Sequence, residues 1–589
     1  MPLPRPILLL VAFSASLLCT ASAADTQPHE TSPLKKTATT RKPAPKKIPA
    51  EKTTLTPAPT PPGPLPEKVR EWFDASTLQR LSLEEAIGLA LTNNLDAKIE
   101  KTTVAAERAR VQFEVGAFDP VFSAQATRES NRRPENINDL STSQQALERD
   151  RIRAIRENTN ELLAIQGLPR LSIEDTAIGI RSVNFDQQNE RFSTSLIQRT
   201  PWGMRVGLFA EANRLYSTFS TNTAPVTAEY QTVAQIQLVQ PLLKDFGPSA
   251  NLANLRTARI AKRVSILNWK KQVMSSLQAV ITSYFDMVYG VANVQVRQDA
   301  IAADEKLVQY NQRRLEVGFS QPFDVQQALA QVSLDKEQLL ATKNVLLERQ
   351  FALKRLILPA FQASDPRVFL PAKSRPLPLP PLDRSLWLQL AFANRPDFQS
   401  ALADAEAQDV RLRFAKNQLL PQLDLVASYG LNGLSTTYSE GFNQSLTGHT
   451  PSWSVGLTFR VPLGNIQARA QRDLALAQKE QALLRIKQTE LAIGVDIDTV
   501  LSRIETNRQS QETARNTRRL FEEAVRIGTR RLEEGQVSNF ELVEQLRRLY
   551  DAKSRELAAE AELNRSISQL WLASGTILEK LGIQLPEEK

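Results

Sequence analysis

The chain contains very little cysteine and histidine. Among its 589 residues there is one cysteine, Cys19, and there are two histidines, His29 and His449, which lie far apart in the sequence. Zinc sites and disulfide frameworks need clusters of these residues, and most Ser or Cys nucleophiles need a histidine as base. No Gly-rich phosphate loop is present either. We therefore expect no metal, no cofactor and no enzyme of these classes, although a site built from Asp and Glu alone is still allowed.

The positive charge is concentrated at one end of the chain. The formal net charge is +9, but residues 1–70 carry ten Lys or Arg against four Asp or Glu. The remaining residues are thus close to neutral, which argues against a nucleic-acid groove. Aromatic residues make up only 6% and there are 21 glycines, so we expect a helix-rich body.

The amino terminus has the features of a secretory signal. Arg5 precedes an apolar stretch that begins at Ile7, and Ala21-Ser22-Ala23 offers a small-residue cleavage site. We predict a signal peptide over 1–24, with a membrane anchor as the alternative, and cleavage without lipidation of Cys19. Residues 25–70 are rich in proline and lysine, which predicts a disordered linker. Such a linker is most simply a solvated tether, and its lysines could also contact an anionic surface such as peptidoglycan.

The rest of the chain reads as one unit written twice. Phe118-Asp119-Pro120 recurs as Leu419-Leu420-Pro421, at an offset of 301. Gln240-Pro241-Leu242 recurs as Val461-Pro462-Leu463, at an offset of 221. Arg313-Arg314-Leu315-Glu316-Val317-Gly318 recurs as Arg530-Arg531-Leu532-Glu533-Glu534-Gly535, at 217. The order is kept, so we predict a first repeat over 80–360, a Pro-rich connector over 361–382 and a second repeat over 383–583.

Each repeat predicts three helices. We expect a first helix over 84–117 and 384–419, a long helix over 249–316 and 465–533, and a last helix over 322–357 and 539–574. A helix of about 70 residues would be roughly 100 Å long. Its apolar residues step by seven, four, three and four, as in Ile486, Ile493, Ile497, Val500 and Ile504, which is typical of coiled-coil packing. Residues 273–295 resemble a membrane helix, but their polar residues favour a packed stripe.

Each repeat also carries two extended segments with strict alternation. From Ser452 to Val461, apolar Trp453, Val455, Leu457 and Phe459 alternate with polar or small residues. Similar alternation begins near Phe122, Tyr230 and Leu423. This pattern is typical of a transmembrane β-strand or of a soluble sheet with one buried face. Four strands cannot close a barrel, so membrane strands would require several chains to share one; three chains would supply about twelve strands. The stretch 129–229 could add a hairpin, with strands near 196–199 and 205–212 and a charged helix over 144–166, which leaves the strand count open.

The ordered recurrence of these elements resembles the TolC-like outer-membrane efflux protein family. The segment Leu81-Ser82-Leu83-Glu84-Glu85-Ala86-Ile87 looks like that family's start of repeat, and the two Pro-Leu junctions resemble its strand-to-helix joints. The resemblance implies a mainly α fold with membrane β-structure: a tandem-duplicated, long-helix α-barrel in the periplasm and a transmembrane β-barrel shared by a homotrimer. It also implies a twelve-stranded barrel in the outer membrane, with Trp453, Val455, Leu457 and Phe459 facing lipid.

The resemblance assigns a role to the turns between the long helices. Val317, Gly318, Phe319 and Ser320 form one expected tip, and Gly535, Gln536 and Val537 the other. In the family such tips dock a periplasmic adaptor that links the duct to an inner-membrane pump. Glu541, Glu544 and Asp324 resemble the family's acidic ring at the periplasmic entrance; alternatively, they are acidic residues favoured at helix starts. The family's latch often includes a Tyr where Leu532 stands here.

The function implied is a passive outer-membrane duct for efflux or type I secretion. The alternative is a non-channel coiled-coil scaffold of the envelope, tethered by the linker. A scaffold has no need of the alternating segments, which therefore favour the duct. The sequence does not identify the exported substrate.

Overall fold

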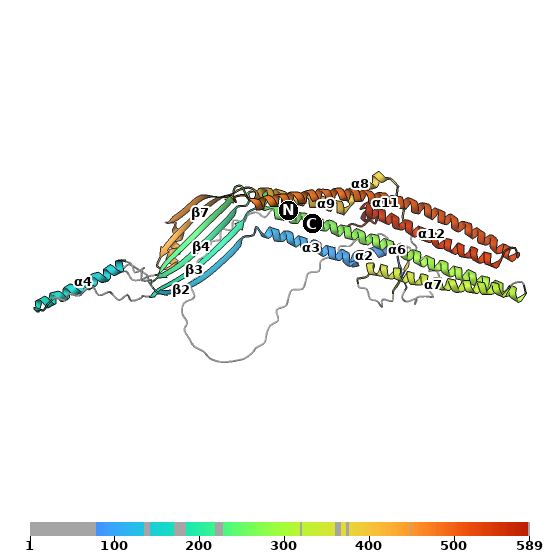
Figure 1. The fold of residues 1–589 in the computed structure, drawn as a ribbon, viewed down its shortest axis with the longest axis horizontal. Helices are drawn as coiled ribbons and strands as arrows, with labels where there is room; N and C mark the ends of the chain where they lie inside the picture. Colours follow the sequence, from blue (N-terminus) through green and yellow to red (C-terminus); the bar gives the residue numbers. More distant parts are fainter. Residues whose placement is uncertain are drawn as a thin grey trace, which may run out of the picture. The chain divides into compact units, whose positions relative to one another are not determined.

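The computed structural model describes residues 78–134, 142–169, 184–217, 228–318, 321–359, 367–372, 376–448 and 450–586. The expected signal peptide over 1–24 and the expected linker over 25–70 lie outside these residues. Within them, two long helical hairpins and one large sheet account for most of the structure (Figure 1).

The first expected helix of each repeat is two helices. In the first repeat α2 (Leu83–Asn93) is followed by α3 (Leu95–Gly116), and in the second α8 (Arg384–Asn394) is followed by α9 (Pro396–Gln418). Asn94 has a non-helical backbone, with a ψ of 120°, and its side chain accepts a hydrogen bond from the Ala97 N–H, so it starts α3 as a cap. Pro396 lacks a backbone N–H and is therefore suited to the first turn of α9. The prediction of continuous helices over 84–117 and 384–419 was wrong at these two breaks.

The long helices match the expected positions closely. Helix α6 (Ala253–Glu316) has 64 residues and follows the short α5 (Pro248–Asn251), while α11 (Ile466–Glu533) has 68. Each returns through a hairpin, into α7 (Pro322–Ile357) and α12 (Asn539–Ala573) respectively. The short α13 (Ile577–Lys580) follows α12. No described helix combines the length and apolar character of a membrane span.

A six-stranded antiparallel sheet adjoins these helices. Its strand order is β2-β3-β4-β5-β7-β8. The strands are β2 (Val121–Pro134), β3 (Asn184–Arg199), β4 (Arg205–Ser217), β5 (Glu229–Pro241), β7 (Gln422–Ser435) and β8 (Pro451–Arg460). The charged helix α4 (Thr142–Ile165) lies between β2 and β3 in sequence, and α10 (Tyr438–Thr447) between β7 and β8. The stretch 129–229 thus adds the hairpin β3–β4, and the chain has six strands in this sheet instead of the four behind the expected twelve-stranded barrel.

A second, smaller sheet was not predicted. Strands β1 (Leu78–Leu81) and β6 (Val368–Pro371) pair in parallel, although one precedes the first repeat's helices and the other lies in the connector. Both strands have only four residues, too few for a recognisable alternation. The hydroxyl of Tyr284 in α6 donates to the carbonyls of Leu81 and Ala372, at 3.3 Å each, and so ties this sheet to the long helix.

The main core lies around the middle of α6. Tyr284, Ile281 and Met287 are fully buried there, and the second repeat contributes Ile493 and Ile497 from α11. Trp269 of α6, Trp387 of α8 and Trp571 of α12 are all buried in this same core. Burial of such large apolar surfaces is what holds the two repeats together.

Candidate functional site

One face of the large sheet is apolar and exposed across all six strands. Residues directly opposite each other in the ladders form one continuous row, with one member from each strand: Phe122, Leu196, Leu208, Ile236, Tyr429 and Trp453. Their exposed fractions run from 37% to 74%. An exposed apolar face of this extent marks an interaction surface, because a soluble monomer would bury it.

The alternating apolar side chains predicted for this segment belong to β8 and lie on this apolar face. Trp453, Val455, Leu457 and Phe459 are between 63% and 74% exposed. The inserted hairpin contributes to the same face through Phe192 and Leu196 of β3 and Leu208 of β4. The apolar face ends in a charged row, where Glu190 lies 3.5 Å from Arg128 and 3.4 Å from Arg214.

The other face of the sheet is largely polar. Its row between the same strands contains Ser123, Ser195, Phe209, Gln235, Gly430 and Ser452. Phe209 is the exception; its ring covers Gly207, where an added Cβ would lie 2.5 Å from a ring carbon. The sheet is thus apolar on one side and polar on the other, the alternation that barrels in membranes require.

The turn of the inserted hairpin is anchored at the junction between sheet and helices. The Gly247 N–H donates to the carbonyl of Trp202 at 3.1 Å. Gly203 has a φ of +94°, and a Cβ there would lie 2.5 Å from the Asp245 carbonyl oxygen, so the backbone needs glycine. Asn251 donates to that same carbonyl at 2.7 Å.

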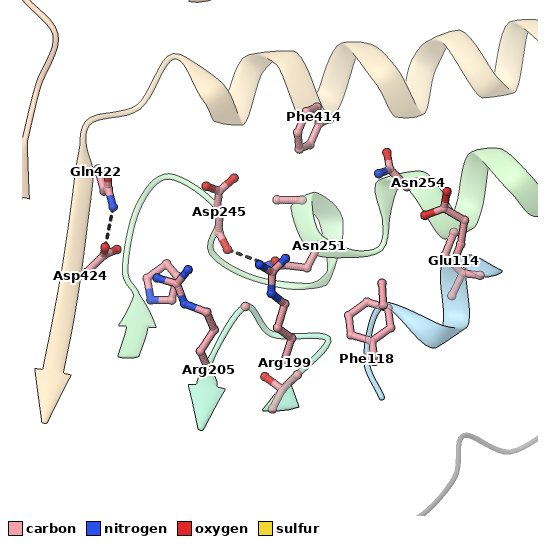
Figure 2. A pocket seen from close by; sticks show the side chains of 16 residues that line it. Glu114, Phe118, Arg199, Arg205, Asp245, Asn251, Asn254, Phe414, Gln422 and Asp424 are labelled. Carbon is pink, nitrogen blue, oxygen red and sulfur yellow. Dashed lines mark hydrogen bonds between the residues drawn. The ribbon is translucent and has the colours of Figure 1, made fainter. Parts of the chain in front are cut away.

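Beside this turn is a cavity of about 390 Å³ lined by charged side chains. Figure 2 shows Arg199 and Arg205, which flank the turn, next to Asp245 and Asn251 of the segment that leads into α6, with Asp424 and Gln422 of β7 on the far side. Gln422 donates to Asp424 at 2.6 Å. The contacts show that the hairpin is built into the junction and is not a loose insertion.

The tip of the second helical hairpin is a tight reversal at Gly535. Gly535 has a φ of +71°, and the Gln536 N–H donates back to the Arg531 carbonyl at 2.8 Å, which is a Schellman cap. Val537 is half-buried in the turn. The first tip begins the same way, with Gly318 at a φ of +77° and Val317 68% exposed. Phe319 and Ser320, which the sequence also assigned to this tip, lie outside the described residues.

The acidic residues proposed for the entrance lie at the starts of α7 and α12, as the sequence placed them. Asp324 accepts a hydrogen bond from the Gln321 N–H at 3.2 Å, and Ser538 caps α12 by accepting from the Glu541 N–H at 3.3 Å. Glu544 accepts from both Arg547 and Arg548, at 2.8 to 2.9 Å. These two guanidinium groups lower the pKa of Glu544 to about 2. Two arginines therefore accompany this carboxylate, which sequence spacing alone did not reveal.

The tips also contain residues that sequence reasoning did not assign a role. Phe323 and Phe540 occupy equivalent positions at the starts of α7 and α12, and they are 69% and 64% exposed. Their recurrence at the offset of 217 was the available signal. Leu532, at the expected latch position, is buried with Leu307, Leu542 and Val543, so at this position the chain has apolar packing.

A pair of buried carboxyl groups between α6 and α7 was also missed. Asp304 and Asp335 are only 5% and 6% exposed. Burial and the hydrogen bond to Asp335 raise the pKa of Asp304 to about 8. Tyr550 of α12 lies nearby, and burial and the neighbouring acids raise its pKa to about 12. Among the described residues no cluster suited to a metal ion was found.

Known protein structures share this arrangement of helices and strands. Three solved structures share the fold: the CmeC outer membrane channel of Campylobacter jejuni (16% identity, 84% of this chain and 86% of that one, TM-score 0.55), a membrane protein from Pseudomonas aeruginosa (17%, 84% and 93%, 0.57), and the outer membrane protein VceC of Vibrio cholerae (13%, 84% and 96%, 0.55). No curated protein matches the chain significantly.

The family comparison is independent of these structures. The model described as outer membrane efflux protein matches residues 187–357 and 387–576, which together are more than half of the chain. The first match begins in β3 and ends with α7, and the second runs from α8 to just beyond the end of α12. The protein belongs to the outer membrane efflux protein family.

Proposed function

We propose that three copies of this chain form an outer-membrane duct that passively exports substrates. An inner-membrane pump would deliver them through a periplasmic adaptor, either in tripartite efflux or in type I secretion. The long paired helices would form the wall of a tube in the periplasm, and the large sheet would contribute to a barrel shared by the three chains. Energy would come from the pump.

The observation that carries this proposal is the two-faced sheet. Its apolar face, with Trp453 and Leu457 at one edge and Phe122 at the other, is suited to contact with lipid, and its polar face to a water-filled interior. Unpaired strand edges are prohibitively costly in a bilayer, so β2 and β8 would each need a partner from another chain. A coiled-coil scaffold would have no use for this face.

The tips support the adaptor assignment. Val317 with Gly318, and Gly535 with Gln536 and Val537, would be docking elements, and the exposed Phe323 and Phe540 would add apolar contact area. Glu541, Glu544 and Asp324 would surround the entrance. Because Arg547 and Arg548 accompany Glu544, we expect a ring of alternating charge there in place of a purely acidic one. The linker over 25–70 could contact peptidoglycan.

Conductance and native mass measured on one sample test the proposal. The mature chain would be purified from outer membranes in detergent and inserted into planar bilayers. A trimer that conducts supports the duct. A trimer without conductance at any voltage, in the unmodified chain and in the variant with Glu541→Gln and Glu544→Gln, would contradict it, and a non-conducting monomer that extracts without detergent would favour the scaffold.

A further inference from the structure

We infer that the barrel wall contains six strands from every chain, eighteen in a trimer, and that β8 of one chain pairs with β2 of the next in a register already present inside each chain. This inference rests on the proposed shared barrel and goes beyond it, because the family resemblance implies twelve strands. It names both the edge residues that meet and the partner, a second copy of this chain.

The inserted hairpin β3–β4 belongs to the wall of the proposed barrel. Strands β3 and β4 pair along their whole length with β2 and β5, and their apolar residues continue the exposed face without a gap. At the junction, the described strands β2, β5, β7 and β8 connect to the helices α3, α5 with α6, α9 and α11, whereas β3 and β4 are joined there by the short turn at Gly203. That turn is held by Gly247 and Asn251, so the hairpin is fixed at the junction.

Among the described residues, no further strand pairs with either edge of the sheet, and the two edge strands have compatible directions. All ten residues of β8 are exposed, and so are residues 121–130 of β2. Six consecutive antiparallel strands place β2 and β8 in opposite directions. The edge strand of one chain can therefore pair with the opposite edge of the next chain, and the antiparallel pattern continues around the ring.

The pairing of β5 with β7 inside the chain is a template for the pairing between chains. Strand β5 ends the first repeat's part of the sheet and β7 begins the second repeat's part, and these two strands pair directly. In the repeat, β5 corresponds to β8 at an offset of 221, and β7 corresponds to β2 at an offset of 301. The proposed pairing of β8 with β2 of the next chain is therefore equivalent to the pairing of β5 with β7, one repeat further around the ring.

The template fixes the register residue by residue. Gln237 of β5 lies opposite Ser428 of β7. Shifting by the two offsets gives Thr458 opposite Thr127 of the next chain, both on the polar face. The same shift turns the pair Leu238 and Ala427 into Phe459 and Ala126, both on the apolar face. The offsets were read from proline landmarks alone, yet they match polar with polar and apolar with apolar.

The pore would be wider than the resemblance implies. Barrel diameter grows roughly linearly with strand number, so eighteen strands give about 1.5 times the width of twelve, in the range of barrels that leave an aqueous channel. The helical tube receives no additional helices from the hairpin, because β3 and β4 are joined only by their turn. The extra width therefore belongs to the membrane end of the duct.

Disulfide formation in the outer membrane tests the register. The Leu242 N–H donates to the Leu423 carbonyl, and pairs alternate from there, so Gln237 and Ser428 are a non-hydrogen-bonded pair, the kind whose Cβ atoms are close enough for a disulfide. Thr127→Cys with Thr458→Cys should therefore link chains when oxidised. The two residues lie on opposite edges of the six-stranded sheet, so a link within one chain is excluded.

Three control proteins make the result of this experiment interpretable. Gln237→Cys with Ser428→Cys is the positive control and should form a disulfide within each chain. Thr127→Cys with Ser454→Cys places the second cysteine on the same face but four residues away, and should not link chains. The unmodified chain controls for Cys19. We expect a non-reducing ladder that ends at three chains, and eighteen strands in a reconstruction of that trimer.

Each other outcome overturns the inference. A ladder from the Ser454→Cys pair alone would show a different register, a ladder that ends at two chains would exclude eighteen strands, and twelve strands in the reconstruction would remove the hairpin from the wall. Conductance measured on the same sample separates this inference from the proposed function. A linked trimer that does not conduct contradicts the duct only, while a conducting protein that forms the control disulfide but no interchain link contradicts the register only.

Discussion

The long helices α6 and α11 hold equivalent places in the two repeats but differ sharply in burial. Helix α6 has 23 buried residues and α11 has eight. The difference follows from their neighbours: α6 packs on α3 and α7 of its own repeat and also on α9 and α12 of the other, whereas α11 packs mainly on α9 and α12 of its own. By comparison with α6, helix α11 lacks two neighbours within the chain, the equivalents of α9 and α12. In the proposed trimer these would be α3 and α7 of the next chain.

The surface that α11 leaves open is apolar. Leu484, Leu491 and Val495 are 58%, 73% and 64% exposed, and their spacing places them on one side of the helix. That side is about half a turn away from the buried Ile493 and Ile497. A helix that is apolar on two opposite sides is built to be covered on both.

The largest effect is expected from a substitution on this exposed apolar side of α11. Leu491→Lys would bury an unpaired charge between chains, at a cost of about 3–5 kcal/mol per chain, and should abolish the trimer while leaving the helix content unchanged. Ala492→Lys, which adds the same charge at the neighbouring exposed position about a quarter turn around the helix, is the control. Native mass spectrometry in detergent reads the outcome. A Leu491→Lys protein that stays trimeric would place this side of α11 in the interior of the tube.

The equivalent experiment on α6 should damage the fold itself. Leu277 is 1% exposed in the main core, so Leu277→Ala should lower the free energy of unfolding by about 2–5 kcal/mol. Leu520→Ala, at a position of α11 that is 67% exposed, should change it by about 0.5 kcal/mol or less. Urea unfolding followed by circular dichroism compares the two. Equal losses would show that burial within one chain does not govern stability.

A third difference between the repeats predicts a dependence on pH. At the offset of 217, Asp304 and Asp335 of the first repeat correspond to Phe521 and Ala552 of the second. The pKa of Asp304 is raised from 3.8 to about 8 in the fold, so between these values the folded state binds more protons than the unfolded state. Stability from this site is therefore full below pH 4 and is lost as the pH rises towards 8.

Replacing the pair should remove that dependence. We expect the melting temperature of the unmodified protein to fall between pH 5 and pH 8.5, and Asp304→Asn to flatten this fall. Asp304→Phe with Asp335→Ala makes the first repeat resemble the second and should have the same effect. Tyr550 of α12 lies near the pair and also near Asp299, so Asp299→Asn is the control for that contribution. A fall that persists in both variants would assign the pH dependence to another group.

The sequence predicts the regular elements well and their interruptions poorly. The alternation in β8 and the uninterrupted helical patterns of α7 and α11 placed these elements to within a residue or two, because one face of each is consistently apolar. The breaks at Asn94 and Arg395 were missed because a single cap residue hardly disturbs the helical pattern around it. Asn94 and Arg395 are equivalent at the offset of 301, and this recurrence was the available signal for a shared structural feature.

The site was harder to predict where it depends on tertiary contacts. The hairpin β3–β4 could be suspected from Pro201-Trp202-Gly203, but only its pairing with β2 and β5 makes it part of the sheet. Asp304 and Asp335 come together because α6 and α7 pack against each other after the turn between them. Nothing in the local sequence marks either residue as buried. The role of Arg547 and Arg548 beside Glu544 depends on rotamers, which spacing permits but does not determine.

The smallest expected effect concerns the charges at the tip of the second repeat. Glu544→Gln leaves Arg547 and Arg548 without their carboxylate, so the reversal potential in a KCl gradient should shift towards anion selectivity. Glu541→Gln should shift it in the same direction, and Glu523→Gln, which breaks a similar pair with Arg526 farther back along α11, should not. The shifts are small because exposed charges are screened beyond about 8 Å at physiological ionic strength, and they should grow as salt is lowered. Equal shifts from all three variants would mean that selectivity reflects total charge and that Glu541 and Glu544 do not line the entrance.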